Sequence, residues 1–353
     1  MYKKIVKNNR GIALLVTLTV VTVLVAVSLE LNRRVRSSAY STAATRDRIA
    51  LSHMASSGIN AAMAMLAKDK KESDSDSLQE DWADPEKRSE VIRDIPFENG
   101  DVTLIISDEL GKIQVNALVI FPEGQAPNHS QMFMWDRFLR FLISQDQTLE
   151  EIDPRMIINS VKDWLDSGDD DAITGLSGAE SDYYQDLDPP YFCGNGPFTC
   201  LGELVFVRGI TPDFFHGAGG IPGIFRYVTV DGINNSGEYE GRININTADL
   251  PVLAAMLPSE NQDLASAIDE YRREVSDSKY IHDLSSPVWY KNVPGCSDIT
   301  IDPKLITISS DLFRIESIAR LNQMQVIVIA VVHRVKDKKT GKWKCRILSW
   351  QSD

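Results

Sequence analysis

Residues 1–29 read MYKKIVKNNRG (1–11) followed by IALLVTLTVVTVLVAVSL (12–29), and this stretch decides the class of fold. The first eleven residues carry four positive charges and no acidic residue, and Ile12 to Leu29 contain no charged residue. At about 1.5 Å per residue, such a helix approaches the hydrocarbon thickness of a bilayer. The sequence therefore predicts one membrane-spanning helix whose basic flank stays in the cytoplasm.

The position of Gly11 predicts how this segment is processed. A secretory signal would end in a small-x-small cleavage site, but the apolar run continues directly into ELNRR (30–34). A glycine between a basic leader and the membrane run resembles the type III signal that prepilin peptidase cleaves. We expect cleavage between Gly11 and Ile12. The alternative is a plain signal anchor that is not cleaved.

The pattern that follows predicts one long helix and then a globular body. Apolar residues recur at mostly helical spacing over residues 33–67, with almost no Gly or Pro. Residues 68–94 are polar and charged, which predicts a solvated connector with structure resuming near Trp82. A long apolar helix followed by a globular body is the plan of pilins.

The body alternates between strand and helix patterns. DVTLIIS (101–107) and KIQVN (112–116) are rich in β-formers, and the turn-like DELG (108–111) between them predicts a hairpin. Helical patterns follow over 130–165, 200–215 and 249–275, with prolines near two of the helix starts. Strand patterns return at 312–318, 323–332 and 343–350, the last two joined by the basic turn 336–342. We expect these late strands to complete the sheet that begins near residue 100.

Charge and motif content argue against two classes of function. The 353-residue chain has 37 basic and 50 acidic residues, a formal net charge of −13, whereas phosphate binding needs a cationic surface. The five histidines are scattered, and the chain has no HExxH, nucleophile elbow or P-loop. The sequence predicts a structural and interaction subunit, not an enzyme.

An ordered set of motifs carries a family resemblance. After Gly11 and the carboxylate-free segment come DWLD (163–166), GAE (178–180), YY (183–184), NGPF (195–198), EL (203–204), RGIT (208–211) and NINTA (244–248). Read in this order, the chain resembles type II secretion system protein K, the large minor pseudopilin of the general secretion pathway, over nearly its whole length.

The resemblance implies an α+β, pilin-like fold in which a long N-terminal transmembrane helix packs on an antiparallel sheet and a large α-helical domain is inserted. The expected parts are a leader (1–11), the transmembrane and pilin helix (12–67), the first part of the pilin-like domain (68–117), a first inserted helical domain with the acidic loop (118–242), a second inserted helical domain (243–310) and the final strands (311–353).

The resemblance also implies a function and partners. We expect a subunit that caps a periplasmic pseudopilus and helps initiate its assembly, held in the Gram-negative inner membrane by one span with its body in the periplasm. The expected partners are minor pseudopilins I and J, the pseudopilus shaft, the assembly platform, the prepilin peptidase and membrane lipid, with no nucleic acid. The new N-terminus is expected to be methylated.

One departure from ordinary pilins fits a terminal position. Most pilin-like subunits have glutamate at the fifth mature position, but counting from Ile12 places Val16 there, as in protein K members. A carboxylate in lipid is costly unless it is paired, and in a pilus its partner is thought to be a neighbouring subunit's amine. A subunit without this glutamate offers no acceptor for the N-terminal amine of a subunit packed above it.

The acidic loop is the candidate metal site. Nine acidic residues and no Lys or Arg lie between Asp163 and Asp188. Clustered oxygen ligands favour calcium, although by charge alone a solvated loop is the better interpretation. The resemblance favours calcium, and the candidate ligands are Asp166, Asp169, Asp170, Asp171, Glu180 and Asp182.

Two further features allow alternatives. NINTA (244–248) resembles the opening of helix-hairpin-helix modules, so the second hypothesis is a periplasmic DNA-capture protein of a type IV pilus or competence system. A helix cap and turn made by Asn246 and Thr247 is the stronger interpretation.

Cys193 and Cys200 flank a flexible Gly- and Pro-containing loop that could close as a disulfide, or both thiols could stay reduced.

Overall fold

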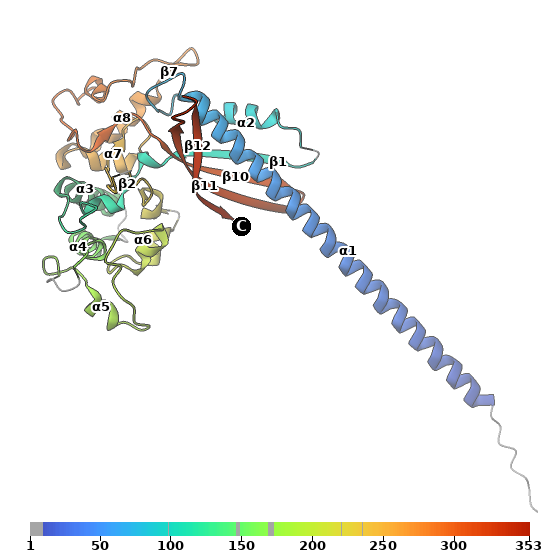
Figure 1. Ribbon diagram of the computed structural model, residues 1–353. Helices are drawn as coiled ribbons and strands as arrows, with labels where there is room; N and C mark the ends of the chain where they lie inside the picture. Colours follow the sequence, from blue (N-terminus) through green and yellow to red (C-terminus); the bar gives the residue numbers. More distant parts are fainter. Residues whose placement is uncertain (1–9, 98, 146–148, 169–172, 220, 235) are drawn as a thin grey trace, which may run out of the picture.

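The first element is a single long helix that leaves the body. The computed structural model describes residues 10–97, 99–145, 149–168, 173–219, 221–234 and 236–353. Helix α1 (Arg10–Asp69) is one unbroken helix, and by length and composition its Gly11–Asp69 part could cross a membrane. Residues 11–29 are all exposed, and the first buried residue in the described part is Leu51. The predicted long helix is confirmed, and only its C-terminal part lies along the body (Figure 1).

That C-terminal part packs on one face of a four-stranded antiparallel sheet. The strands are ordered β1-β10-β11-β12 and are β1 (Asp101–Asp108), β10 (Leu312–Leu321), β11 (Met324–Lys336) and β12 (Trp343–Ser352). The late strands therefore complete the sheet begun near residue 100, as predicted. Leu51, Ile59 and Leu66 of α1 share a core with the inward residues of β1, β10 and β11. A Cβ on Gly58 would lie 2.3 Å from Ser317 Oγ, so glycine permits this close approach.

Helix α2 (Pro85–Arg93) also packs against β1. Its N-terminus is capped by Asp84, whose side chain accepts from the Glu86 N–H. The connector before it, residues 70–84, is not the solvated segment that its composition predicts. Asp76 is fully buried and Trp82 nearly so. Asp76 pairs with Arg334 of β11, far away in the sequence, and composition does not reveal this pair.

Residues between β1 and β10 form the large insert. Its helices of five or more residues are α3 (His129–Gln145), α4 (Pro154–Leu165), α5 (Ser181–Gln185), α6 (Pro212–His216), α7 (Leu250–Met256), α8 (Ala265–Arg273), and the 3-10 segments η4 (Leu201–Phe206) and η6 (Ser259–Leu264). Shorter 3-10 segments are η1 (Glu109–Gly111), η2 (Val115–Leu118), η5 (Ile224–Arg226) and η7 (Trp289–Asn292).

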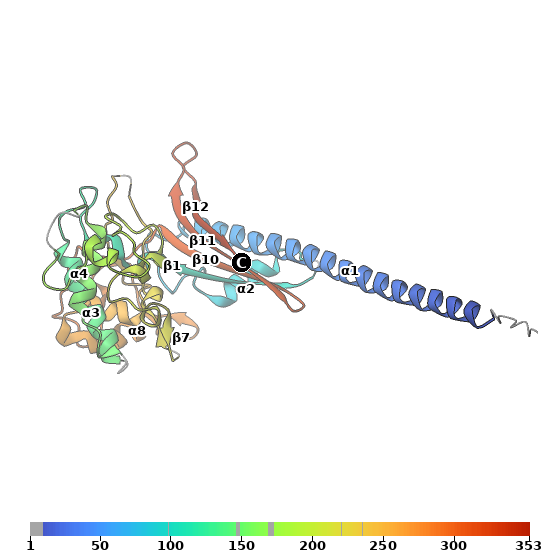
Figure 2. The same cartoon turned by 90° about the horizontal axis from the view of Figure 1, so that it is seen from below.

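Short strands pair within the insert. They are β2 (Ile113–Gln114) with β5 (Val228–Thr229), β3 (Gly217–Ala218) with β4 (Ile221–Pro222), β6 (Ile243–Asn244) with β9 (Ile306–Thr307), and β7 (Val275–Ser276) with β8 (Lys279–Tyr280). One hydrophobic core runs through both predicted inserted domains, from Ile113 to Leu305. The insert lies beyond the end of the sheet that is opposite the free part of α1, in both views (Figures 1 and 2).

The predicted hairpin at 101–116 is wrong. Strand β1 pairs with β10, and β2 pairs in parallel with β5. The segment between them is the 3-10 turn η1, whose first N–H groups are capped by Asp108: its side chain accepts from Leu110 N at 2.8 Å. This turn carries the chain from the sheet into the insert. The insert contains β5, the partner strand of β2, and Asn244, which donates a hydrogen bond to the Asp108 side chain.

Candidate metal site and the contacts between body and insert

Helix α4 supplies the first acidic side chains of the candidate metal site. It begins with an Asp153 cap and a first-turn proline, and it buries an apolar face that includes Ile157, Val161 and Trp164. DWLD (163–166) forms its last turn and C-cap, so Asp163 and Asp166 lie three residues apart on one side of the helix end. Local helix signals therefore place two carboxylates at the edge of the acidic loop.

Asp163 is buried and holds the loop that follows. Its carboxylate accepts from Thr174 N at 3.1 and 3.2 Å and from Ala179 N at 2.9 Å. Burial raises the pKa of Asp163, and the hydrogen bonds to Thr174 oppose that increase. A Cβ on Gly178 would lie 1.9 Å from Asp163 Oδ2. Glycine at 178 is thus required for the loop to reach this carboxylate.

Three carboxylates come together here, and we call Asp163, Asp166 and Glu180 the acidic site. Each offers an oxygen within 4.8 Å of the others. Asp166 Oδ2 accepts from Lys162 Nζ at 2.5 Å, while Asp166 Oδ1 is buried with no hydrogen-bond partner among the described residues. Oxygen-only donors with one unbonded buried oxygen fit a hard divalent cation such as calcium, with Lys162 as the competing counter-charge.

The predicted ligand set is brought together in part. Asp166 and Glu180 belong to the acidic site, and Asp182 is exposed in the first turn of α5, outside that group. Asp169, Asp170 and Asp171 lie outside the described residues. Sequence reasoning left Asp163 out of the ligand set. Its three-residue spacing from Asp166 at a helix end is the signal that could have found it.

The other motifs pack around the acidic site. Trp164 stacks on Phe198 with ring centroids 6.0 Å apart. It packs edge-to-face with Tyr184, and the centroids of these two rings are 5.2 Å apart. Arg208 donates from Nη1 to the Gly178 carbonyl at 3.1 Å, and its backbone N–H donates to Tyr184 Oη at 3.3 Å. Motifs that are separate in the sequence therefore form one packed unit.

The cysteines beside this unit have different environments. Cys193 is buried, and its Sγ lies 3.6 Å from the Asp163 carbonyl oxygen. Cys200 is exposed at the N-terminus of η4, where its backbone N–H donates to Glu203 Oε1 at 3.1 Å. The disulfide between them stays a prediction.

NINTA (244–248) joins the insert to the body. Asn244 Nδ2 donates to Asp108 Oδ2 at 2.8 Å and to the Asp76 carbonyl at 3.0 Å, and Thr247 Oγ1 donates to Asp108 Oδ2 at 2.7 Å. Burial raises the pKa of Asp108 to about 6, although these donors oppose the increase. Asn246 Oδ1 accepts from Trp289 Nε1 at 2.7 Å.

These contacts correct the interpretation of NINTA as a helix cap. The turn is present, because Thr247 N and Ala248 N both donate to the Asn244 carbonyl. The N-cap of α7 is Asp249, however, which makes no side-chain cap hydrogen bond. Asn246 and Thr247 are instead engaged in the long-range contacts just described.

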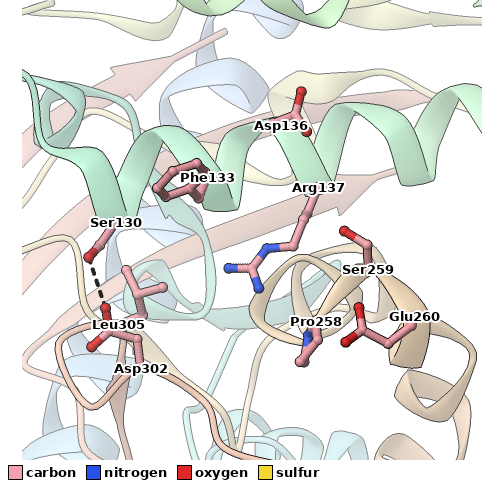
Figure 3. A pocket seen from close by; sticks show the side chains of 9 residues that line it. All are labelled: Ser130, Phe133, Asp136, Arg137, Pro258, Ser259, Glu260, Asp302 and Leu305. Atoms are coloured by element: carbon pink, nitrogen blue, oxygen red, sulfur yellow. Dashed lines mark hydrogen bonds between the residues drawn. The ribbon is translucent and has the colours of Figure 1, made fainter.

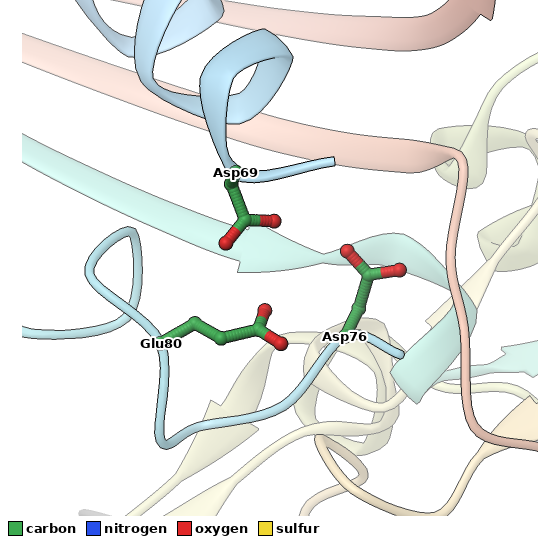
Figure 4. Close-up of side chains that lie close together, drawn as sticks. All are labelled: Asp69, Asp76 and Glu80. Carbon is green, nitrogen blue, oxygen red and sulfur yellow. The ribbon is translucent and has the colours of Figure 1, made fainter. Parts of the chain in front are cut away.

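A second acidic group lies where α1 meets the connector, and we call Asp69, Asp76, Glu80 and Arg334 the junction cluster. Oxygens of its three carboxylates lie within 4.8 Å of one another, with Asp69 at the end of α1 and the other two on the connector (Figure 4). Arg334 is fully buried and pairs with Asp69 at 3.1 Å and with Asp76. Lys70 adds an ion pair to Asp76 at 3.1 Å. Two cations among the acids make this an ionic contact within the fold.

The junction cluster still carries an excess of negative charge. Burial, and then repulsion from Asp76, raises the pKa of Asp69 to about 6 despite the opposing effect of Arg334. Burial, followed by repulsion from Asp69, raises the pKa of Glu80 to about 7, although Trp82 Nε1 donates to it at 2.7 Å. Both carboxyls are therefore protonated more readily than in an unfolded chain.

A pocket of about 390 Å³ lies between α3, the start of η6 and the loop before β9 (Figure 3). Ser130 Oγ donates to Asp302 Oδ2 at 2.8 Å, Arg137 Nη1 donates to the Leu257 carbonyl at 2.8 Å, and Asp136 pairs with Arg140. Among the described residues that line it there is no histidine or cysteine.

The architecture defines the class of fold: it is pilin-like, with an apolar N-terminal helix that extends beyond an α+β body. A family model described as "Type II secretion system (T2SS), protein K" matches residues 111–217, which run from η1 to the end of α6 and include the acidic site. The chain is therefore similar to type II secretion system protein K, and the resemblance predicted from the ordered motifs is confirmed.

Curated relatives and a solved structure agree. Type II secretion system protein K of Klebsiella pneumoniae is 26% identical over 204 residues, covering 58% of this chain and 59% of the relative, so this match spans less than two thirds of that protein. The Pseudomonas aeruginosa protein of the same name is 26% identical over 282 residues, covering 77% and 75%. A chain in the crystal structure of the GspK-GspI-GspJ complex from enterotoxigenic Escherichia coli has a TM-score of 0.59 at 16% identity, covering 89% of this chain and 99% of that one. The structural match supports the fold.

Proposed function

We propose that this chain is a minor pseudopilin of a type II secretion system that caps the tip of the periplasmic pseudopilus and helps initiate its assembly. The observation that carries the proposal is the position of the insert. It lies beyond the end of the sheet opposite the free part of α1 (Figure 1). In a fibre, a subunit packed above this one would have to occupy that place. Bulk at that end opposes further addition above this subunit.

The membrane segment supports the same position. Gly11, Ile12 and Val16 lie in the first turns of α1, and Ile12 and Val16 are both exposed, at 62% and 55%. If prepilin peptidase removes residues 1–11, the fifth mature position is a valine with no carboxylate. This subunit would then offer nothing to the N-terminal amine of a subunit above it, while its own amine could still pair with a glutamate below.

The proposal includes the partners and the compartment. The partners are minor pseudopilins I and J, which the family resemblance implies, and the matched crystal structure is itself a GspK-GspI-GspJ complex. The inner membrane holds the apolar helix, the body lies in the periplasm, and the assembly platform and prepilin peptidase act on the membrane segment. Both the role of a non-enzymatic subunit and methylation of Ile12 follow from the same proposal.

Calcium is proposed as the ligand of the acidic site. Asp163, Asp166 and Glu180 would each supply a carboxylate oxygen, and acidic residues of the neighbouring loop would complete the shell. The ion would neutralise repulsion between carboxylates that burial brings together. Its role is structural, because it would tie the end of α4 to the segment that begins α5.

Labelling of pseudopili tests the tip position. We expect an epitope tag on this subunit to give one gold label at one end of each fibre in cells that overproduce the major pseudopilin. As a control, the same tag on the major subunit should label the whole shaft. Regular labelling of the shaft by this chain would refute the capping role, even if the protein remained necessary for secretion.

A further inference from the structure

Four exposed or half-buried aromatic side chains lie on the segments that follow the acidic site: Tyr183 in α5, Tyr191 and Phe192 in the loop after it, and Phe206 at the end of η4. We call these four residues the aromatic patch. Phe192 is 71% exposed, Phe206 51% and Tyr183 37%, while Tyr191 is half-buried between its neighbours. Large aromatic side chains are enriched at protein interfaces because each removes much apolar area from water with few rotamers to fix. Three of the four stand within residues 183–192 and the fourth, Phe206, contacts Tyr191, and an exposed aromatic group of this kind calls for an explanation.

Ring contacts order three of the four side chains, Tyr183, Tyr191 and Phe206. Tyr191 stacks on buried Tyr184 with centroids 5.3 Å apart, meets Phe206 edge-on at 5.6 Å and donates from Oη to the Phe206 carbonyl at 2.8 Å. The Arg208 guanidinium lies 4.7 Å from the centre of the Tyr183 ring. A surface whose rings are already ordered loses little conformational entropy when a partner binds.

The charge around the patch selects the kind of partner. Residues 181–192 contain Asp182, Asp186 and Asp188, all exposed, and no Lys or Arg. Arg208 is already engaged with Tyr183 and with the Gly178 carbonyl. Carboxylates beside open aromatic faces attract lysine and arginine, by charge and by cation–π contact, and repel anionic surfaces.

We propose that the aromatic patch binds a basic, apolar polypeptide segment of another protein. Apolar side chains of that segment would cover Phe192 and Phe206, and its lysine or arginine residues would face Asp182, Asp186 and Asp188. The acidic rim makes an anionic membrane surface an unfavourable occupant. This inference does not depend on the capping role, since it rests on the rings and charges alone.

The test uses the full-length protein in phosphatidylcholine nanodiscs and three fluorescent peptides, repeats of Lys-Leu-Ser, Gln-Leu-Ser and Glu-Leu-Ser. We expect anisotropy to show binding of the Lys peptide, weaker binding of the Gln peptide and none of the Glu peptide. Binding should weaken as salt is added. Phe192→Ser and Phe206→Ser should each reduce affinity about tenfold, the effect of losing one substantial interface contact that is smaller than a hot spot.

Phe133→Ser is the matched control, because Phe133 is 69% exposed on α3 and outside the patch; it should bind as the wild type does. The thermal midpoints of all three variants are measured, so that loss of folding is distinguished from loss of binding. Failure of the Lys peptide to bind, equal binding of the Glu peptide, or unchanged binding by folded Phe192→Ser overturns the proposal. So does self-association that Phe192→Ser abolishes, because the occupant would then be a second copy of this chain.

Discussion

Arg334 of β11 donates from Nη1 to Asp69 Oδ2 at 3.1 Å and to the Leu66 carbonyl at 3.2 Å, which ties an inner strand of the sheet to the last turn of α1. The same guanidinium contacts Asp76 and donates to the Ser310 carbonyl at 2.6 Å. One fully buried side chain thus links the helix, the connector and the chain segment that returns from the insert. Because α1 also carries the apolar run that is long enough to cross a membrane, this contact connects the helix with that run to the body.

Arg334→Met should destabilise the body strongly, by about 3–5 kcal/mol, because Asp69 and Asp76 would be left buried without their main cation. Urea unfolding monitored by tryptophan fluorescence measures the change. The control is Arg346→Met on β12, whose side chain is exposed and whose loss should alter the free energy of unfolding by less than about 0.5 kcal/mol. Equal effects of the two substitutions would show that the junction cluster contributes no special stability.

The junction cluster should make the body less stable as pH rises from about 4 to about 7. The folded-state pKa values of Asp69 and Glu80 are raised to about 6 and about 7, so the folded chain binds more protons than the unfolded chain in this interval. Stability therefore falls with increasing pH. Thermal midpoints across this range, compared between the wild type and Glu80→Gln, measure the effect.

Glu80→Gln should flatten that pH dependence, because the amide cannot ionise. Asp74→Asn is the control, since Asp74 is exposed on the same connector. The calcium concentration must be the same at every pH, because the carboxylates of the acidic site could also change the thermal midpoint with pH. If the thermal midpoint of Glu80→Gln fell more steeply with pH than that of the wild type, the raised pKa of Glu80 would not be the cause of the pH dependence.

Gly178→Ala should destabilise the loop between α4 and α5 by about 1–3 kcal/mol, since the added Cβ would meet Asp163 Oδ2 at 1.9 Å and Thr174 N at 2.8 Å. Gly196→Ala is the matched control. Its Cβ would approach nothing nearer than the Gly194 carbonyl at 3.8 Å. Limited proteolysis of the loop and chemical denaturation should both separate the two variants.

Processing gives a prediction that concerns the pilin class directly. In cells with prepilin peptidase, the membrane-extracted protein should begin at Ile12 and carry one methyl group on its amine. Intact-mass and N-terminal peptide mass spectrometry decide between this outcome and an uncleaved signal anchor, which would begin at Met1. Peptidase-deficient cells provide the control, because there both hypotheses give the unprocessed chain.

The parts of the fold that sequence patterns predicted are those whose signals are local and repeated. The apolar run and helical spacing predicted α1, and the β-rich segments predicted β10, β11 and β12. The hairpin failed because Asp108 is satisfied by Asn244 and Thr247, more than a hundred residues later. Burial of the connector was missed for a similar reason: besides nearby Lys70, Asp76 pairs with Arg334, and nothing near Asp76 in the sequence reveals that distant pair.

The candidate site shows the same division. Composition identified the acidic loop, and Asp166 and Glu180 do meet. Asp163 was not selected as a ligand because its burial depends on packing of α4 against Tyr184 and Phe198, which lie on later segments. The counter-charge of Asp166 is Lys162, which stands one residue before the acidic stretch begins and was therefore not counted.

Calcium should raise the melting temperature of the protein relative to EDTA, because an ion that binds only the folded state stabilises it by RT ln(1 + [L]/Kd), about 2.7 kcal/mol at a hundredfold excess over Kd. Magnesium should substitute poorly, since it demands a tighter octahedral shell. Asp166→Asn with Glu180→Gln should remove most of the calcium effect, because Asp166 Oδ1 is buried and has no hydrogen-bond partner among the described residues, while Glu180 supplies the ligand from the α5 side. Asp182→Asn, an exposed change outside the acidic site, should retain it. The double variant also loses the ion pair between Lys162 and Asp166, so the calcium effect is measured as the difference between calcium and EDTA within each variant. If calcium stabilises the double variant as much as the wild type, the ion binds elsewhere and the acidic site is an ordinary ion-paired end of α4.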